Sequence, residues 1–282
     1  MPRSRFAGAA CRMLFLACSL IAVVHVAPAA ALVSPDSALL AQDIASAGRL
    51  RMQSQRLAKL YQQAAMGLNA VQAQQQIGLA GGEVELEFGR LARYGKKPAI
   101  QRTYTRSEAL WQDLRGALKQ APTVASAERV NQLADELMLH TGKLAMQIEA
   151  DGETPVGRLL DLSSRLNMLA QRLARLYLQV QAGDRSQGVL TDVEQARKEF
   201  ATGLRELDTA RENSPASREN IALAKNQWIF FESAVNRLGG ADRSDGKAIQ
   251  HVATSSERIA QVLEATSLQY ARDYGEGQRL AR

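Results

Sequence analysis

Arg51 is the residue of this sequence best suited to bind a small ligand. On a helical projection it shares one face with small or uncharged side chains: Ile44, Ala47, Gly48, Ser54, Gln55 and Ala58. Small side chains let a second helix approach closely, and a guanidinium held where two helices meet is partly desolvated and needs an anion. Its planar fork fits a carboxylate or a small planar oxyanion. The sequence therefore predicts Arg51 as an anion ligand; the alternative is a solvated arginine, or one paired with a nearby Asp or Glu.

Three neighbours on this face, Gly48, Ser54 and Gln55, are weaker candidates for ligand contact. A glycine inside a helix costs about 1 kcal/mol relative to alanine, so Gly48 needs a packing reason. Arg49 and Arg56 project to another side of the helix, where ion pairs or packing of their stems are expected instead. This face of small residues predicts close contact with another helix, either from the same chain or from a second molecule of the protein.

The residues that could carry catalysis or bind a metal form no recognisable set. His140 and His251 are the histidines that follow residue 31, and Glu136 lies one helical turn before His140. A di-iron bundle needs several Glu and His ligands, and covalent haem attachment needs a C-x-x-C-H segment. The sequence contains neither, and it has no P-loop, dinucleotide fingerprint or nucleophile elbow. We therefore expect no enzyme activity and no metal or cofactor.

Residues 1–31 have the pattern of a secretory signal peptide. Three arginines precede or enter an apolar stretch, Met13–Val26, and three alanines before Leu32 supply a cleavage site. Both cysteines, Cys11 and Cys18, lie in this segment, so a cleaved protein has no disulfide. We expect export to the periplasm; the alternative is an uncleaved N-terminal helix that anchors the chain.

The charge balance gives little support for nucleic-acid binding. The whole chain has 35 basic and 29 acidic residues, a net charge of +6. Without the three arginines of residues 1–31 the balance is 32 against 29, a net charge of +3. A surplus this small, spread along the chain, predicts no nucleic-acid partner.

An internal repeat organises the chain. Residues 49–61 read RLRMQSQRLAKLY and residues 165–177 read RLNMLAQRLARLY, with nine of 13 positions identical. Trp111 and Trp228 recur in the same order, and their positions predict a duplicated core anchor. Glu87-Phe88 is matched with Glu199-Phe200, and residues 128–130 are matched with residues 257–259. The chain therefore consists of two copies of one helical unit.

Helix-start and helix-stop signals divide each copy into four helices, and no segment has the alternation of a strand. In the first copy the predicted helices are 35–76, with a bend near Gly67, then 83–94 after a break at 78–82, 98–119 and 123–150. In the second copy they are 155–182, 188–211, 215–238 and 247–273. Proline at the first helical position, after a capping Ser34 or Thr154, supports the starts at Pro35 and Pro155, and Pro98 starts the third helix. The prediction is an all-α protein of two tandem up-down four-helix bundles, 32–150 and 151–282, after a signal peptide at 1–31.

Residues 47–56, with the sequence AGRLRMQSQR, closely resemble the periplasmic P-box of NarX-type nitrate and nitrite sensor kinases. Both copies also resemble the N-terminal sensory domain of PilJ-type pilus chemotaxis transducers. The resemblance implies a periplasmic four-helix bundle that acts in chemotaxis or signal transduction. It further implies that Arg51, which matches the P-box arginine, binds nitrate or nitrite where two first helices meet.

The chain departs from this family in two respects. It has no segment that matches the membrane anchor, linker and signalling region of such receptors. In its second copy Asn167 replaces the arginine, and Leu169-Ala170 replaces the Gln-Ser pair. A site formed by the two copies of one chain would contain one Arg51, whereas a homodimer would bring two together.

Two functions are consistent with these observations. The first is a periplasmic sensory module that binds a small anion such as nitrate or nitrite and signals through a separate membrane receptor or kinase. The second is a structural or adaptor protein that docks a membrane sensor or envelope partner through its helices and binds no small ligand.

Overall fold

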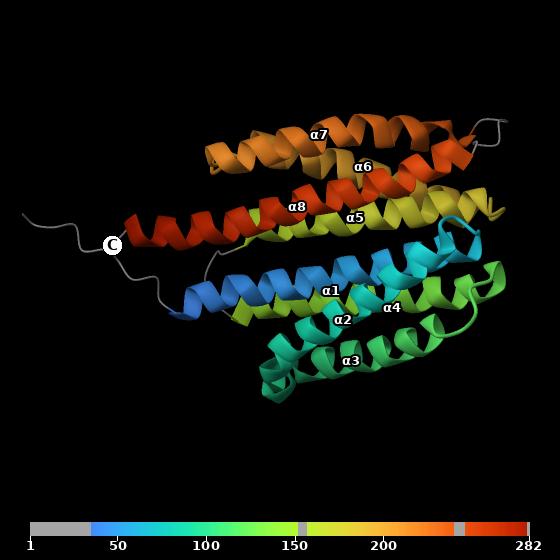
Figure 1. Cartoon of the computed structure of the whole chain (residues 1–282). Coiled ribbons are helices and arrows are strands. Elements are labelled where there is room, and N and C mark those ends of the chain that lie inside the picture. Colours follow the sequence, from blue (N-terminus) through green and yellow to red (C-terminus); the bar gives the residue numbers. More distant parts are fainter. Residues whose placement is uncertain (1–34, 152–156, 240–245, 281–282) are drawn as a thin grey trace, which may run out of the picture.

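The computed structural model describes residues 35–151, 157–239 and 246–280, and every regular element in these ranges is a helix (Figure 1). The predicted all-α class is therefore confirmed. Residues 1–31, the predicted signal peptide, lie outside the described residues. None of the described helices is long and apolar enough to cross a lipid bilayer.

The helices follow one another with short connections. In the first half they are α1 (Pro35–Ala65), α2 (Ala70–Leu91), the 3-10 helix η1 (Ala92–Lys96), α3 (Pro98–Leu118) and α4 (Val124–Asp151). In the second half they are α5 (Arg158–Gln181), α6 (Gln187–Thr209), α7 (Pro215–Asn236), the 3-10 helix η2 (Arg237–Gly239) and α8 (Gly246–Leu280). Pro98 and Pro215 open α3 and α7, as the sequence predicts, because proline fits the first helical position.

The two repeat-derived helices α1 and α5 lie side by side and join the halves of the molecule (Figure 1). α1 packs against α2, α4 and α5, and α5 packs against α6 and α8. Gly48 lies against Ser164, and Gln55 bonds to Arg175 further along both helices, so α1 and α5 run in the same direction. The helix pairs α2–α3 and α6–α7 form the outer layers of the stack (Figure 1).

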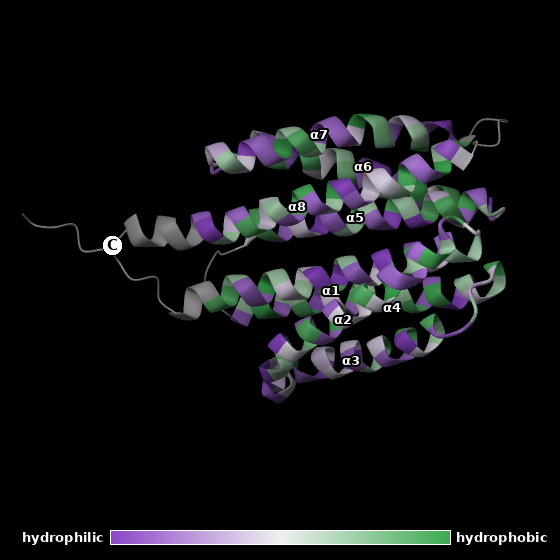
Figure 2. Ribbon diagram, viewed as in Figure 1, coloured by the Kyte–Doolittle hydropathy of each residue, from purple (hydrophilic) through white to green (hydrophobic). Residues whose placement is uncertain are grey.

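Buried hydrophobic residues form one cluster that spans both halves. Fully buried members on the two central helices are Leu50, Leu57 and Tyr61 of α1 and Leu166, Leu173 and Tyr177 of α5. Trp111 and Trp228 are both buried members of this cluster, in agreement with the predicted core anchors. Hydrophobic and hydrophilic residues are interspersed along the helices (Figure 2); the outer helices bury one face, whereas α1 and α5 are buried over most of their surface.

The predicted break at residues 78–82 is wrong, because these glycines lie inside α2. The first helix ends earlier, at Ala65, where Gly67 and Asn69 have φ angles of 72° and 49°. A left-handed backbone interrupts a helix, whereas a helical glycine only weakens it by about 1 kcal/mol. Burial of Ala80 and Val84 on α2 compensates for that weakness.

Two of the matches proposed between the copies are wrong by whole helical turns. Burial pairs Val84 with Phe200, so Phe88 is not the counterpart of Phe200. On the last helices, Gln55 Nε2 donates to the carbonyl of Ala134, and its counterpart Gln171 donates to that of Ser256. The next residues, Asp135 and Glu257, therefore correspond, and Glu128 corresponds to Gln250.

Candidate functional site

The small-residue face of α1 packs against α5 of the same chain. A Cβ atom on Gly48 would lie 1.9 Å from Ser164 Oγ and 2.9 Å from Ser164 Cβ, so a side chain fits there only if Ser164 changes rotamer and the two helices move slightly apart. Ala47 and Ala58 on this face are also buried. The contact expected between copies is therefore formed within one chain, and Gly48 supplies the close approach.

Arg51 is buried at the junction of α1, α4 and α5, with 8% of its surface exposed. Its Nη2 lies 3.2 Å from Asp161 Oδ1 on α5. Gly142 of α4 faces the stem of Arg51, and a Cβ there would lie 3.4 Å from Arg51 Cδ, in ordinary van der Waals contact. Burial lowers the pKa of Arg51, since desolvation outweighs the attraction of Asp161, and Arg165 adds repulsion.

The Arg51 guanidinium is only partly satisfied. Arg51 Nε is buried and makes no hydrogen bond to the described residues. A buried N–H without a partner costs about 1–3 kcal/mol. The guanidinium therefore has donor capacity for one more acceptor beside Asp161, as a planar oxyanion would provide.

The other predicted site residues have partners of their own. Ser54 Oγ donates to the backbone carbonyl of Arg51 at 2.8 Å. Gln55 Nε2 donates to Asp135 Oδ1 at 2.9 Å, and Gln55 Oε1 accepts from Arg175 Nε at 3.0 Å. Gly48, Ser54 and Gln55 therefore contribute to the packing of the helices around Arg51. None of them accepts a hydrogen bond from Arg51 Nε, the donor that has no partner among the described residues.

The sequence interpretation missed two buried cations, Lys59 and Arg175. Lys59 of α1 is fully buried, and its Nζ donates to Ser256 Oγ at 3.0 Å and pairs with Glu257 of α8. Arg56 also pairs with Glu257, at 2.9 Å. Burial alone would raise the pKa of Glu257, but Lys59 and Arg56 together lower it to about 2. Desolvation lowers the pKa of Lys59.

Arg175 is the counterpart of Lys59 in the second copy. Its Nη2 lies 2.9 Å from Asp135 Oδ1 on α4 and 3.1 Å from Oδ2. Each central helix thus sends a buried cation to the last helix of the other half. The signal in the sequence was a basic residue at the same position of both copies, amid apolar neighbours.

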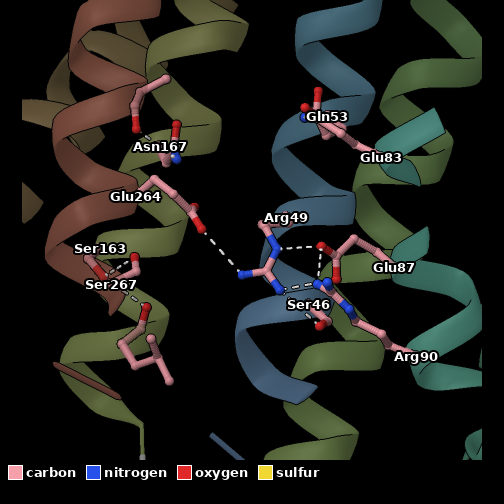
Figure 3. A network of polar contacts seen from close by, with 12 residues as sticks. Ser46, Arg49, Gln53, Glu83, Glu87, Arg90, Ser163, Asn167, Glu264 and Ser267 are labelled. Carbon is pink, nitrogen blue, oxygen red and sulfur yellow. Dashed lines mark hydrogen bonds and ion pairs between the residues drawn. The ribbon is translucent and has the colours of Figure 1, made fainter. Parts of the chain in front are cut away.

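A third polar cluster joins α1, α2 and α8 around Arg49 (Figure 3). Arg49 Nε lies 2.7 Å from Glu87 Oε1, and Nη1 lies 3.2 Å from Glu264 Oε1 across the gap to α8. Ser46 Oγ accepts from Nη2 at 3.0 Å. Although burial opposes the charge, Glu87 and Glu264 raise the pKa of Arg49. Arg49 and Arg56 are thus ion-paired between helices, the pairing that the sequence indicated for both.

Position 51 differs between the copies in structure as well as in sequence. Asn167, the counterpart of Arg51, donates from Nδ2 to the carbonyl of Ala260 at 3.3 Å, and its Oδ1 is buried without a partner. Within the described residues, no group of His, Cys, Asp or Glu could hold a metal ion. The Arg51 guanidinium, paired with Asp161, keeps one buried donor without a partner among the described residues. No model of a known protein family, no curated protein and no solved structure matches the chain.

Proposed function

We propose that this chain is an exported periplasmic sensory module that binds a small planar oxyanion, such as nitrate or nitrite, at Arg51. The observation that carries the proposal is the buried Arg51 guanidinium whose Nε has no partner. The P-box-like sequence around it supports the choice of anion, and the apolar stretch in residues 1–31 supports export.

In this proposal the anion competes with Asp161. The carboxylate meets Arg51 through a single 3.2 Å contact and is one-third exposed, so it can leave for water. A bound oxyanion would accept from Nε and one terminal nitrogen, which is the bidentate geometry that a guanidinium favours. Because Asp161 belongs to α5 and Arg51 to α1, the exchange would alter the packing of α1 against α5. A separate membrane receptor or kinase, or a second copy in a homodimer, would read that change.

A second candidate is the adaptor function. The observation that favours it is Asp161 itself, which already neutralises Arg51 without a ligand. In that case Arg51 and Asp161 form a structural ion pair, and the helices serve to dock a membrane sensor or envelope partner.

The variant Asp161→Asn separates the two functions. If the anion competes with Asp161, removing the carboxylate should tighten nitrate binding by roughly tenfold, which corresponds to about 1.4 kcal/mol. Without nitrate the variant should be less stable than the parent protein, and saturating nitrate should restore its melting temperature by mass action. Isothermal titration and thermal melts with nitrate, nitrite, chloride and sulfate measure both effects.

Two further variants serve as controls. Arg51→Ala should abolish the titration signal in either background. Asp208→Asn removes one carboxylate from an exposed pair with Lys225 and should leave both readouts unchanged. Failure of Asp161→Asn to bind any of the four anions, with an intact helical spectrum, would overturn the sensory proposal and favour the adaptor.

A further inference from the structure

The two halves carry equivalent grooves, each between the first two helices of one half and the last helix of the other. The larger groove, about 750 Å³, lies between α4 and the α5–α6 connection. The smaller, about 270 Å³, lies between α8 and the α1–α2 connection. Matching positions line both, such as Leu176 with Leu60 and Gln179 with Gln63.

The larger groove is acidic. Four carboxylates line it, those of Glu128, Asp135, Asp184 and Asp192, against one cation, Arg175. Arg175 is committed to Asp135, and Arg172 reaches Asp192 at 3.1 Å. Glu128 forms no ion pair with the described residues and is exposed, so the groove keeps an excess of negative charge.

Two amide oxygens in this groove lack donors. Asn131 is 94% buried, with 6% of its surface exposed, and its Oδ1 has no hydrogen-bond partner among the described residues. Gln179 Oε1 is likewise buried without a partner, while its Nε2 donates to Asp184 Oδ2 at 2.8 Å. Unpartnered buried acceptors are costly, and because these two belong to residues that line the groove, a ligand that brings N–H donors would satisfy them.

The lining also limits the kind of cation. The described carboxylates are not grouped closely enough to hold a metal ion. Between them the walls are aliphatic, formed by Val124, Leu176 and Val189. A ligand that fits both features has ammonium groups joined to a short hydrocarbon chain, because acceptors can receive its N–H bonds while the chain covers the apolar wall.

We propose that the larger groove is a binding site for a small aliphatic amine, with Asn131 Oδ1, Gln179 Oε1 and Glu128 receiving its ammonium groups. This site is separate from Arg51 and opposite to it in charge preference. A sensory module with it would respond to two chemically distinct ligands, and the amine site requires no anion at Arg51.

The smaller groove provides an internal comparison. Where the larger groove has Glu128 and Asn131, the smaller has Gln250 and Ala253. Asp192 is matched by Gln76. Its one carboxylate, Glu257, is taken up by Lys59 and Arg56. The smaller groove therefore keeps Gln63 in place of Gln179 but lacks counterparts of the Glu128 carboxylate and the Asn131 amide, and it should not bind the amine.

Titration of the purified protein with 1,4-diaminobutane tests the proposal. Two control ligands are titrated in the same way: 1-butanol, which probes the apolar wall alone, and Mg²⁺, which probes charge alone. Saturable binding of the diamine only is expected. Asn131→Ala and Glu128→Gln introduce the residues of the smaller groove and should each weaken binding by roughly tenfold. Gln250→Ala, the matched change in the smaller groove, should leave it unchanged.

Absence of diamine binding to the parent protein would overturn the proposal, as would groove variants that both bind the diamine as tightly as the parent protein does. Binding of Mg²⁺ at the same affinity would also overturn it, because the site would then select charge and not an amine. Nitrate titration in the same samples is independent of these results, so failure at Arg51 and failure in the groove can be told apart.

Discussion

Replacing Glu257 by glutamine should destabilise the protein by about 3–5 kcal/mol, the usual cost of leaving a buried charge without its partner. Two cations depend on this carboxylate. Lys59 has no exposed surface and Arg56 is 18% exposed, so water can replace little of the lost interaction. Chemical denaturation of parent and variant, followed by circular dichroism, measures the difference.

The same cluster should make stability sensitive to acid. Lys59 and Arg56 lower the pKa of Glu257 from 4.5 to about 2 in the folded protein. Above about pH 4.5 the carboxylate is ionised in both folded and unfolded chains, and its stabilisation is complete. As the pH falls from 4.5 towards 2, the unfolded chain binds the proton first and this stabilisation is lost.

A double variant and a surface variant serve as controls for this cluster. Lys59→Met with Glu257→Gln removes the buried charge together with its partner, so it should recover most of the stability lost by Glu257→Gln alone. It should also show a smaller loss of stability between pH 4.5 and 2. Glu206→Gln breaks an exposed pair with Arg158 and should change stability by less than about 1 kcal/mol. A Glu257→Gln cost no larger than this control would contradict the ion-pair account.

Replacing Gly48 by alanine should destabilise the protein by about 1–3 kcal/mol, the range for overpacking at a tight contact. Alanine is the better helix former by about 1 kcal/mol, so an isolated helix would be stabilised by the same change. The sign reverses here because the new Cβ would lie 2.9 Å from Ser164 Cβ on the neighbouring helix, a contact that a change of the Ser164 rotamer does not relieve. Thermal and denaturant unfolding measure this change.

Gly78→Ala and Gly82→Ala are matched controls, because both glycines are helical and a Cβ at either position would meet no atom within 4 Å. Each should stabilise the protein by up to about 1 kcal/mol. Ser164→Gly should relieve the Gly48→Ala defect, since it removes the atoms in conflict. If Gly48→Ala is as stabilising as the two controls, α1 and α5 do not approach closely in solution.

The sequence was sufficient for those parts of the fold that depend on local chemistry. Helical composition and proline at the first position of α3 and α7 predict helices where they occur. Glycines at 78–82 misled the prediction, because the packing of Ala80 and Val84 that keeps α2 helical involves distant residues.

The burial of Arg51 could be predicted from the sequence, but its partner could not. The small-residue face predicts that Arg51 is held between helices, as its burial bears out. Its counter-ion, Asp161, is 110 positions away, and no local pattern links the two. Lys59 and Arg175 were overlooked for a related reason, since basic residues are expected at the surface and only the tertiary structure shows their acidic partners.

The most direct test of anion binding at Arg51 is the NMR signal of its Nε–Hε group, assigned by its loss in Arg51→Lys and followed as nitrate is added. This group has no acceptor among the described residues, so a bound oxyanion should shift its resonance to a saturating value. The shift should appear at lower nitrate concentration in Asp161→Asn. A resonance that does not move with nitrate in either protein would contradict the proposal that Arg51 binds a planar anion.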